Sequence, residues 1–263
     1  SMTKTSLILI GCGKMGSAML SAWRASDLDL AYLTIDPQAP QSDFKSIEDA
    51  KDEISNAGII VLAIKPQIMS NICADLKPYL SENTCIISIA AGIEVDPLQE
   101  AFSHNQPIIR AMPNTPAAIG KGITVAVANE HTQDTHKATA EALFRCNGLF
   151  EWIEDEGLMN AVTALSGSGP AYIFHLIEIL EKTGAKIGLP PALATTLARQ
   201  TVIGSAALAE AQNDIPAETL RKNVTSPGGT TEAALEVLMN GELEKIFEHA
   251  LKSAVKRGEE LNS

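Results

Sequence analysis

The sequence predicts an α/β fold with a parallel sheet in residues 1–155 and an all-α domain in residues 156–263. Two observations predict this division. Continuous apolar runs of strand length occur only before residue 156, and long segments with helical periodicity dominate after it. A chain of 263 residues, 45% of them apolar, is long enough for two domains that each bury a core.

Six apolar runs are the predicted strands. They are continuous rather than alternating, which indicates strands that are buried on both faces. Helix-period segments separate several of them, so the pattern predicts βαβ units and a sheet covered on both sides. The runs are residues 7–11, 32–36, 59–65, 85–92, 107–112 and 123–128.

A glycine fingerprint, GCGKMG, follows the first run directly and opens a segment with helical character. Gly11 permits a tight turn, Gly13 lets the backbone approach a pyrophosphate, and Gly16 lets the helix pack on the strand. The start of the helix adds free N–H groups and the positive end of its dipole. This context predicts a Rossmann-like dinucleotide-binding domain. The alternative is an ordinary glycine-rich turn between strand and helix.

Two further features lie at predicted strand ends. Asp36 ends the second run, where an acidic residue accepts hydrogen bonds from the adenosine ribose and repels a 2′-phosphate, which favours NAD over NADP. Alternatively, Asp36 and Pro37 only begin a turn. The third and fourth runs end in AIKP and IAAG, at the sheet edge where such folds bind ligands. Lys65 could meet a phosphate or ribose there, or simply mark a strand exit.

The second part of the chain contains three long predicted helices, over residues 170–189, 190–212 and 241–261. The first is apolar on most faces, the second is rich in small residues, and the third has apolar residues at three- and four-residue spacing on one face. This is more apolar helix surface than a module of this size buries alone. The pattern therefore predicts that the helical domain packs against a second copy of the chain.

Composition excludes several classes of protein. The formal net charge is −12 and no short window is dominated by Lys and Arg, so no nucleic-acid partner is expected. No apolar run approaches the ~20 residues of a membrane helix, and the first residues lack a signal-peptide pattern. The four scattered cysteines form no CxxC pair and predict a reducing, cytoplasmic location. No His, Cys and carboxylate cluster has metal-ligand spacing, so no metal is expected.

Two hydroxyl- and glycine-rich motifs interrupt the helical part: SGSGPAY, residues 166–172, and TSPGGTT, residues 225–231. Each is predicted to precede a helix start, whose free N–H groups would bind an anion such as a substrate carboxylate. The alternative is plain helix capping by Ser and Thr. Capping does not by itself require the pair Gly228 and Gly229. All five histidines have the sequence context of solvated side chains, so no strong acid is evident.

Six stretches resemble pyrroline-5-carboxylate reductases, in this order and at this spacing: LILIGCGKMGSAML, AIKP, ISIAAG, IIRAMPNTPAAIGKG, ALSGSGPAYIF and VTSPGGTTEAALEVL. The likeness starts at about Leu7 and continues to the end of the sequence. The stretches RAMPNTPA and SPGGTT are far more specific than the glycine fingerprint. The resemblance implies reduction of the cyclic imine 1-pyrroline-5-carboxylate to L-proline with NADPH or NADH. It also implies homodimers formed through the helical domain, and commonly decamers built from five dimers.

The resemblance also implies the site residues. The substrate carboxylate is expected on Ser226 and on the N–H groups of Gly229 and Thr230. Thr231 is the implied catalytic residue, with its hydroxyl near the ring nitrogen and Glu156 close by. The residues expected to bind the dinucleotide are Ile10, Gly11, Cys12, Gly13, Lys14, Met15, Ala63, Ile64, Lys65, Pro66, Ile89, Ala90, Ala91 and Asn223.

This substrate explains the absent acid, because an imine nitrogen is more basic than a carbonyl oxygen and can arrive already protonated. Asp36 departs from the neutral residue of many family members, so NADH is expected to serve at least as well as NADPH. Two alternatives stay open at this point. One is a reductase of another small cyclic imino or keto acid, and the other is a non-catalytic NAD-binding regulatory protein.

Overall fold

The computed structural model describes residues 4–262 and divides into two compact units. Of the described residues, 4–168 and 254–262 form unit 1, and 169–253 form unit 2. The predicted domain boundary between residues 155 and 156 falls inside unit 1, because residues 156–168 and 254–262 pack with the sheet domain.

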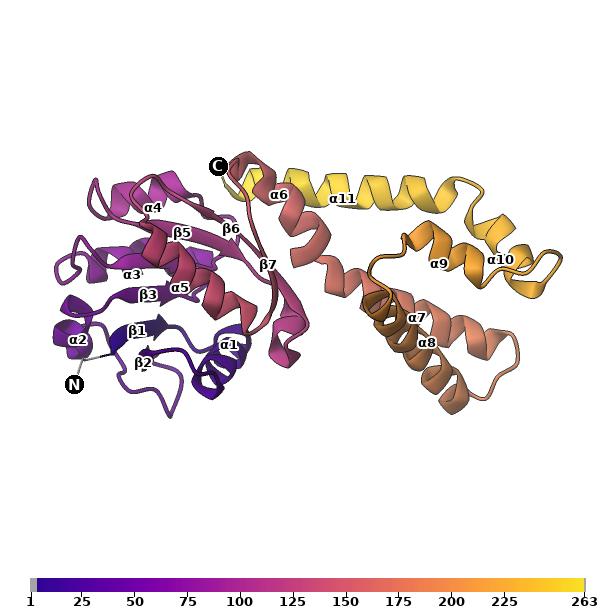
Figure 1. Ribbon diagram of the computed structural model, residues 1–263, viewed down its shortest axis with the longest axis horizontal. Helices are drawn as coiled ribbons and strands as arrows, with labels where there is room; N and C mark the ends of the chain where they lie inside the picture. Colours follow the sequence, from indigo (N-terminus) through magenta and orange to yellow (C-terminus); the bar gives the residue numbers. More distant parts are fainter. Residues whose placement is uncertain (1–3, 263) are drawn as a thin grey trace. The chain divides into compact units, whose positions relative to one another are not determined.

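Unit 1 is built on a seven-stranded sheet with the order β2-β1-β3-β4-β5-β6-β7 (Figure 1). All neighbouring strands are parallel except β5 and β6, which are antiparallel. The strands are β1 Thr5–Ile10, β2 Leu30–Ile35, β3 Ile59–Leu62, β4 Cys85–Ser88, β5 Ile108–Met112, β6 Gly122–Ala128 and β7 Gly148–Trp152. The six predicted strands are confirmed, and the order β2-β1-β3 brings their carboxyl ends to one edge beside the glycine fingerprint.

Two features of the sheet differ from the sequence prediction. Strand β6 runs antiparallel, because the connection from Met112 to Gly122 holds only the short turn η3 (Thr115–Ile119) and is too short for a crossover helix. Strand β7 carries no continuous apolar run. It lies at the edge of the sheet, and Phe150 is its one buried residue.

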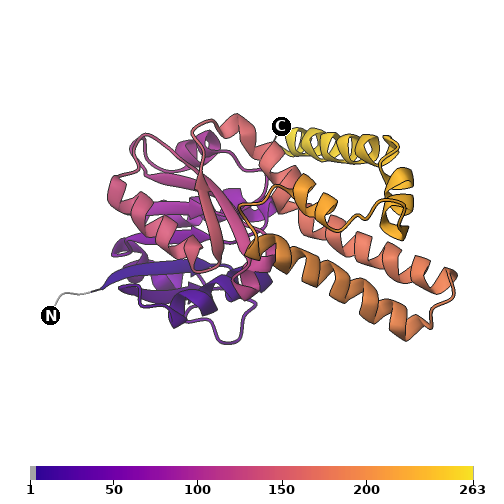
Figure 2. The same cartoon turned by 45° about the vertical axis from the view of Figure 1, so that its right-hand side comes forward.

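The sheet is buried on both faces, as its continuous apolar runs predict. Leu7 and Leu9 of β1 belong to a core covered by α1 and α5, whereas Ile8 and Ile10 belong to a second core covered by α2, α3, α4 and α6 (Figures 1 and 2). The helices are α1 Lys14–Ala25, α2 Lys51–Ser55, α3 Met69–Leu76, α4 Val95–Ala101, α5 Asp134–Arg145 and α6 Met159–Val162. The sheet is therefore the middle layer of three, as in doubly wound folds.

The motif SGSGPAY contains the predicted helix start, at Gly169, but another helix leads into the motif. Helix α6 continues through a π-helical turn, η5 (Thr163–Gly167), into α7 (Gly169–Lys186). The Ser168 N–H donates to the Thr163 carbonyl oxygen at 2.8 Å, so the turn consumes a donor that a helix start would leave free. Asn114 Nδ2 donates to the Ser166 carbonyl oxygen at 3.1 Å. The predicted anion site at this motif stays a prediction.

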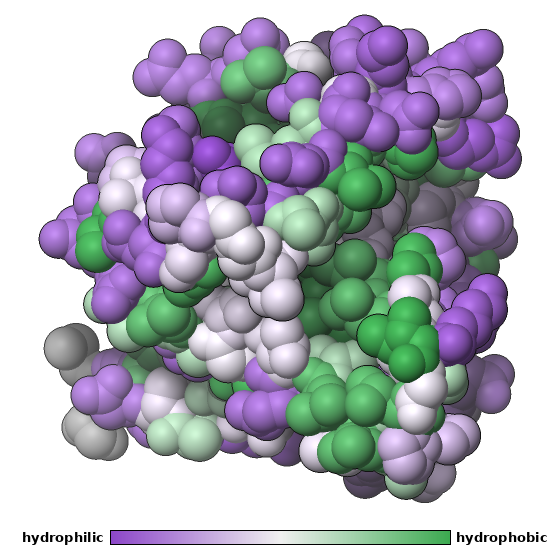
Figure 3. All heavy atoms as spheres, turned by 90° about the vertical axis from the view of Figure 1, so that its right-hand side faces the viewer, coloured by the Kyte–Doolittle hydropathy of each residue, from purple (hydrophilic) through white to green (hydrophobic). Residues whose placement is uncertain are grey.

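Unit 2 consists of helices. They are α7, α8 Pro191–Ala211, α9 Ala217–Asn223, α10 Thr230–Leu238 and the first part of α11 Glu242–Leu261. Helices α7, α9, α10 and α11 contain no buried residue, and many large apolar side chains on unit 2 are exposed. Figure 3 shows green hydrophobic residues gathered on one face of the molecule. No helix within residues 4–262 has the length and apolarity to cross a lipid bilayer.

The end of α11 returns to unit 1. A Cβ at Gly258 would lie 2.7 Å from Asn160 Oδ1, and Asn262 Nδ2 donates to the same oxygen at 3.5 Å. Gly92, which ends the stretch IAAG after β4, lies against Asn262 and Leu261. Residues far apart in the sequence thus complete one compact unit.

Candidate functional site

The glycine fingerprint forms a tight loop between β1 and α1, which we call the glycine loop (residues 11–16). Gly11 has φ +89°, and a Cβ there would collide with the Ala63 carbonyl oxygen. A Cβ on Gly16 would lie 2.9 Å from the Gly11 carbonyl oxygen. Both positions therefore require glycine, one for its backbone conformation and both for the close approach of neighbouring backbone.

A cavity of about 510 Å³ opens beside this loop at the carboxyl ends of β1, β2 and β3. Eight residues that the sequence assigns to the cofactor line it: Ile10, Gly11, Cys12, Gly13, Asp36, Ala63, Ile64 and Lys65. Sequence reasoning did not identify the other nine: Ile35, Pro37, Gln38, Lys45, Ser46, Ile47, Ile68, Ile72 and Asp75. The structure thus brings together residues from three separate segments of the chain.

The glycine loop leaves a group of N–H donors free. Gly11 N–H donates to the Ile35 carbonyl oxygen at 2.9 Å, and Cys12 N–H donates to Asp36 Oδ2 at 2.7 Å. The N–H groups of Gly13, Lys14 and Met15 have no acceptor among residues 4–262. Such donors at a helix start bind phosphate groups. This part of the cavity therefore fits a pyrophosphate.

The far wall of the cavity is apolar. Ile47 follows the β2 connection, Ile64 and Ile68 follow β3, and Ile72 lies on α3. An apolar wall next to ribose- and phosphate-binding groups fits the adenine ring of a dinucleotide. The spacing of Ile64, Ile68 and Ile72 at every fourth residue is the signal in the sequence that could have identified this wall.

The carboxylate of Asp36 connects two parts of this site. Its Oδ2 accepts the Cys12 N–H, and its Oδ1 accepts the Gln38 N–H at 2.8 Å. The neighbouring Cys12 thiol is half-buried, and its pKa is raised by burial and, to a lesser extent, by the charge of Asp36. The thiol is therefore protonated at neutral pH and is not a nucleophile for the reaction.

The remaining predicted cofactor residues of unit 1 lie at the same sheet edge. Lys14 and Met15 begin α1, and Pro66 begins the turn η2 (Pro66–Ile68) after β3. Ile89, Ala90 and Ala91 follow β4, the neighbour of β3. Asn223 is the last residue of α9 and belongs to unit 2.

Glu156 begins the turn η4 (Glu156–Leu158) in unit 1 and accepts hydrogen bonds from Arg110 and Val95. Its Oε2 accepts from Nη1 of Arg110 at 2.9 Å and from the Val95 N–H at 3.0 Å. Arg110 is 3% exposed, whereas the Glu156 side chain is 25% exposed. Glu156 Oε1 has no hydrogen-bond partner among residues 4–262, so this atom is available to a ligand.

The motif TSPGGTT forms a turn that leads into α10. Gly229 N–H donates to the Ser226 carbonyl oxygen at 3.1 Å, with Pro227 and Gly228 between them. Pro followed by a glycine with φ +72° is the arrangement of a type II turn, so Gly228 is required by its conformation. Gly229 is the N-cap residue of α10, and the N–H groups of Thr230 and Thr231 have no acceptor among residues 4–262. The second motif is therefore a helix start with free donors, as predicted.

The doubly wound sheet, the glycine loop and the cavity beside it together define a dinucleotide-dependent oxidoreductase. Comparison with known proteins agrees. Residues 6–92 match the family model "NADP oxidoreductase coenzyme F420-dependent", and residues 156–261 match the model "Pyrroline-5-carboxylate reductase dimerisation".

Relatives of known name cover the whole chain. Pyrroline-5-carboxylate reductase of Pseudomonas aeruginosa is 36% identical, over 99% of this chain and 98% of its own, and that of Pisum sativum is 36% identical over 96% and 94%. The solved reductase of Coxiella burnetii is 34% identical with a TM-score of 0.90, and that of Plasmodium falciparum, with NADP bound, is 29% identical with a TM-score of 0.86; both match over the full length of both chains. The chain belongs to the pyrroline-5-carboxylate reductase family.

Proposed function

We propose that this chain reduces the C=N bond of 1-pyrroline-5-carboxylate to give L-proline, with NADH or NADPH as the reductant. This is the last step of proline biosynthesis. The observation that carries the proposal is the full-length similarity to reductases of that name, at 36% identity. The free donors of the glycine loop and of the α10 start support it, because the reaction needs one anion site for the cofactor and one for the substrate carboxylate.

The dinucleotide would be held by unit 1. The N–H groups of Gly13, Lys14 and Met15 would hold its pyrophosphate, and Asp36 its adenosine ribose. When bound, the cofactor supplies the hydride. The other proposed cofactor residues of unit 1 are Ile10, Gly11, Cys12, Ala63, Ile64, Lys65, Pro66, Ile89, Ala90 and Ala91, with Asn223 from unit 2.

The substrate carboxylate would be held at the start of α10, by the Ser226 hydroxyl and the Thr230 N–H. Gly229 N–H is the third proposed donor, and it would have to share its hydrogen with the Ser226 carbonyl oxygen to which it now donates. We propose that the Thr231 hydroxyl orients the ring nitrogen, and that Glu156 Oε1 lies close to it. A protonated imine needs orientation and charge stabilisation more than a strong acid.

We further propose that NADH serves at least as well as NADPH. Asp36 lies in the wall of the cofactor cavity, where its negative charge would repel a 2′-phosphate and its free lone pairs would accept from ribose hydroxyls. A kcat/KM that strongly favours NADPH would contradict this preference.

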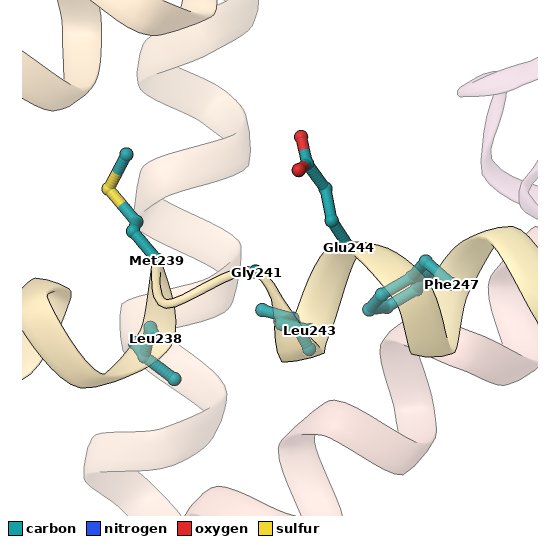
Figure 4. Close-up of a pocket in the computed structure, with 6 residues that line it drawn as sticks. All are labelled: Leu238, Met239, Gly241, Leu243, Glu244 and Phe247. Atoms are coloured by element: carbon teal, nitrogen blue, oxygen red, sulfur yellow. The ribbon is translucent and has the colours of Figure 1, made fainter.

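The exposed apolar surface of unit 2 supports self-association. We propose a homodimer formed through the helices, and a decamer of five dimers as the larger assembly. Between α10 and α11, Leu238, Met239, Leu243 and Phe247 line a mainly apolar cavity of about 400 Å³ that a second copy would fill (Figure 4). Light scattering should report at least a dimer for the wild type and a smaller species for Leu243→Glu, but no change for Lys252→Ala on an exposed face of α11.

We also propose a reducing, cytoplasmic location. The four cysteines Cys12, Cys73, Cys85 and Cys146 are all free, as expected of a chain that folds without disulfides.

The deciding experiment is the oxidation of NADH and of NADPH in the presence of 1-pyrroline-5-carboxylate, with proline identified as the product. A six-membered cyclic imine and a 2-keto acid serve as competing substrates. Binding of NADH without turnover would instead indicate a regulatory protein. If Thr231→Ala left kcat/KM within about twofold of wild type, which is only ~0.4 kcal/mol, the orienting role of Thr231 would be wrong.

A further inference from the structure

The carboxylate of Asp36 accepts hydrogen bonds from two backbone N–H groups in the absence of any ligand. Its two oxygens accept N–H groups from both sides, at 2.7 Å from Cys12 and 2.8 Å from Gln38. Cys12 lies in the glycine loop, and Gln38 lies in the connection after β2. Asp36 therefore ties together the two segments that border the adenosine end of the cavity.

The hydrogen bond that Cys12 N–H donates to Asp36 pairs one donor of the glycine loop and holds this part of the loop in place. The Cys12 peptide is fixed on both sides, because its carbonyl oxygen also accepts from the Ser17 hydroxyl at 2.7 Å. Gly11 N–H is taken by the Ile35 carbonyl oxygen, and the Gly13 carbonyl oxygen accepts the Ser17 N–H at 2.8 Å. With these groups paired, the loop donors that lack an acceptor among residues 4–262 are the N–H groups of Gly13, Lys14, Met15 and Gly16.

We propose that Asp36 is a positioning residue for the pyrophosphate of either dinucleotide, acting through the Cys12 N–H, in addition to any contact with the ribose. The inference rests on the proposed use of a dinucleotide by this chain. It makes a prediction opposite to that of a simple charge selector. If Asp36 only repelled a 2′-phosphate, replacing it with a neutral residue would improve NADPH. If it also positions the glycine loop, the replacement weakens both cofactors.

The side chains that could replace Asp36 differ in how many of its two hydrogen bonds to the backbone they can still accept. Asn retains one acceptor oxygen, but its amide NH₂ would face one of the two N–H donors. The hydroxyl of Ser is one bond shorter and cannot bridge both segments. The loss should therefore be graded, with Asp36→Asn intermediate and Asp36→Ser largest.

The test measures Kd for NADH and for NADPH by cofactor fluorescence, and KM and kcat for each, in Asp36→Asn and Asp36→Ser. In Asp36→Ser we expect Kd and KM for NADH to rise by on the order of tenfold, and those for NADPH to rise less because the repulsion of the 2′-phosphate is relieved; kcat should change less. Asp43→Asn is the matched control. It removes a carboxylate from the same connection, where Asp43 Oδ2 accepts from Thr34 N and Oγ1, and should leave both constants within about twofold.

The rate at which Cys12 is alkylated distinguishes positioning of the glycine loop from a contact with the ribose, because loss of a ribose contact alone would not release the loop. At pH 8, iodoacetamide should modify Cys12 several times faster in Asp36→Ser than in Asp36→Asn, because both changes remove the charge that raises the thiol pKa but only Ser releases the loop. NADH should protect Cys12 in the wild type.

Two results would overturn the proposal: improved NADPH binding in Asp36→Ser, or a Cys12 alkylation rate that is equal in Asp36→Ser and Asp36→Asn. The Kd and alkylation measurements need no turnover. Failure of the proposed reductase activity would therefore be seen separately, as normal NADH binding without reduction of 1-pyrroline-5-carboxylate.

Discussion

The Arg110–Glu156 pair allows a sharp test of what holds unit 1 together. In Glu156→Ala the buried guanidinium of Arg110 and the Val95 N–H both lose their acceptor. Removing one partner of a fully buried ion pair costs about 3–5 kcal/mol. Because the Glu156 side chain is 25% exposed, water can partly replace it, and we expect a loss of about 2–3 kcal/mol. For a domain of this size that corresponds to a Tm lower by about 4–12 °C.

Thermal and urea unfolding of purified variants measure this loss. Glu156→Gln keeps one acceptor oxygen for Arg110 or Val95 and should lose about half as much. Glu154→Ala, at an exposed position two residues away, is the matched control and should melt within 1–2 °C of wild type. Replacing both partners, as Arg110→Met with Glu156→Leu, should restore part of the lost stability since no unpaired charge stays buried.

A Tm of Glu156→Ala equal to that of the wild type would refute the reasoning, because Arg110 would then have found another partner at no cost. The same variants address the proposed substrate contact of Glu156. Below the melting range, kcat/KM of Glu156→Gln should fall if Oε1 contacts the ring nitrogen, and should stay unchanged if the residue only supports the fold.

Three further predictions follow from single residues. Gly11→Ala forces a Cβ onto the Ala63 carbonyl oxygen, so the protein should lose measurable NADH binding by fluorescence titration. Gly228→Ala, at φ +72°, should strain the turn by about 1–2 kcal/mol and raise KM for the imine severalfold, whereas KM for NADH should not change. Burial raises the pKa of Cys85 from 9.0 to about 12. The folded state thus favours the neutral Cys85 thiol. The stability that this preference contributes is complete below pH 9 and should be lost between about pH 9 and 12. Alkaline unfolding curves of Cys85→Ala should show a smaller loss of stability over this range.

The sequence predicted the fold well where local pattern and tertiary environment agree. Strands β1, β3 and β4 are buried on both faces, so their apolar runs are uninterrupted. Strand β7 was not predicted, because an edge strand with one buried residue contains no continuous apolar run. The segment SGSGPAY was only partly predicted, because Ser166 and Gly167 occupy a π-helical turn held by Asn114 across the chain, whereas α7 begins at Gly169 as a helix start.

The site shows the same division between local and distant information. The glycine loop could be predicted because its three glycines fall within six consecutive residues. The pairing of Glu156 with Arg110, 46 residues earlier, and the bond from Cys12 to Asp36 depend on which strands become neighbours. A single sequence does not record that arrangement. The apolar wall of the cavity could be predicted only in part, because the four-residue spacing of Ile64, Ile68 and Ile72 is local whereas Ile47 comes from another part of the chain.

The return of residues 254–262 to unit 1 affects the order of events during synthesis. At about 5–20 residues per second, a ribosome needs roughly 4–17 s to advance from residue 168 to residue 254. During that time Gly92 and Asn160 lack the side chains that later cover them. Unit 1 therefore stays incomplete beside the IAAG stretch until residues 254–262 have been synthesised, after the whole of unit 2. Folding of unit 1 is therefore completed only after unit 2 has been synthesised, through an intermediate with this surface uncovered.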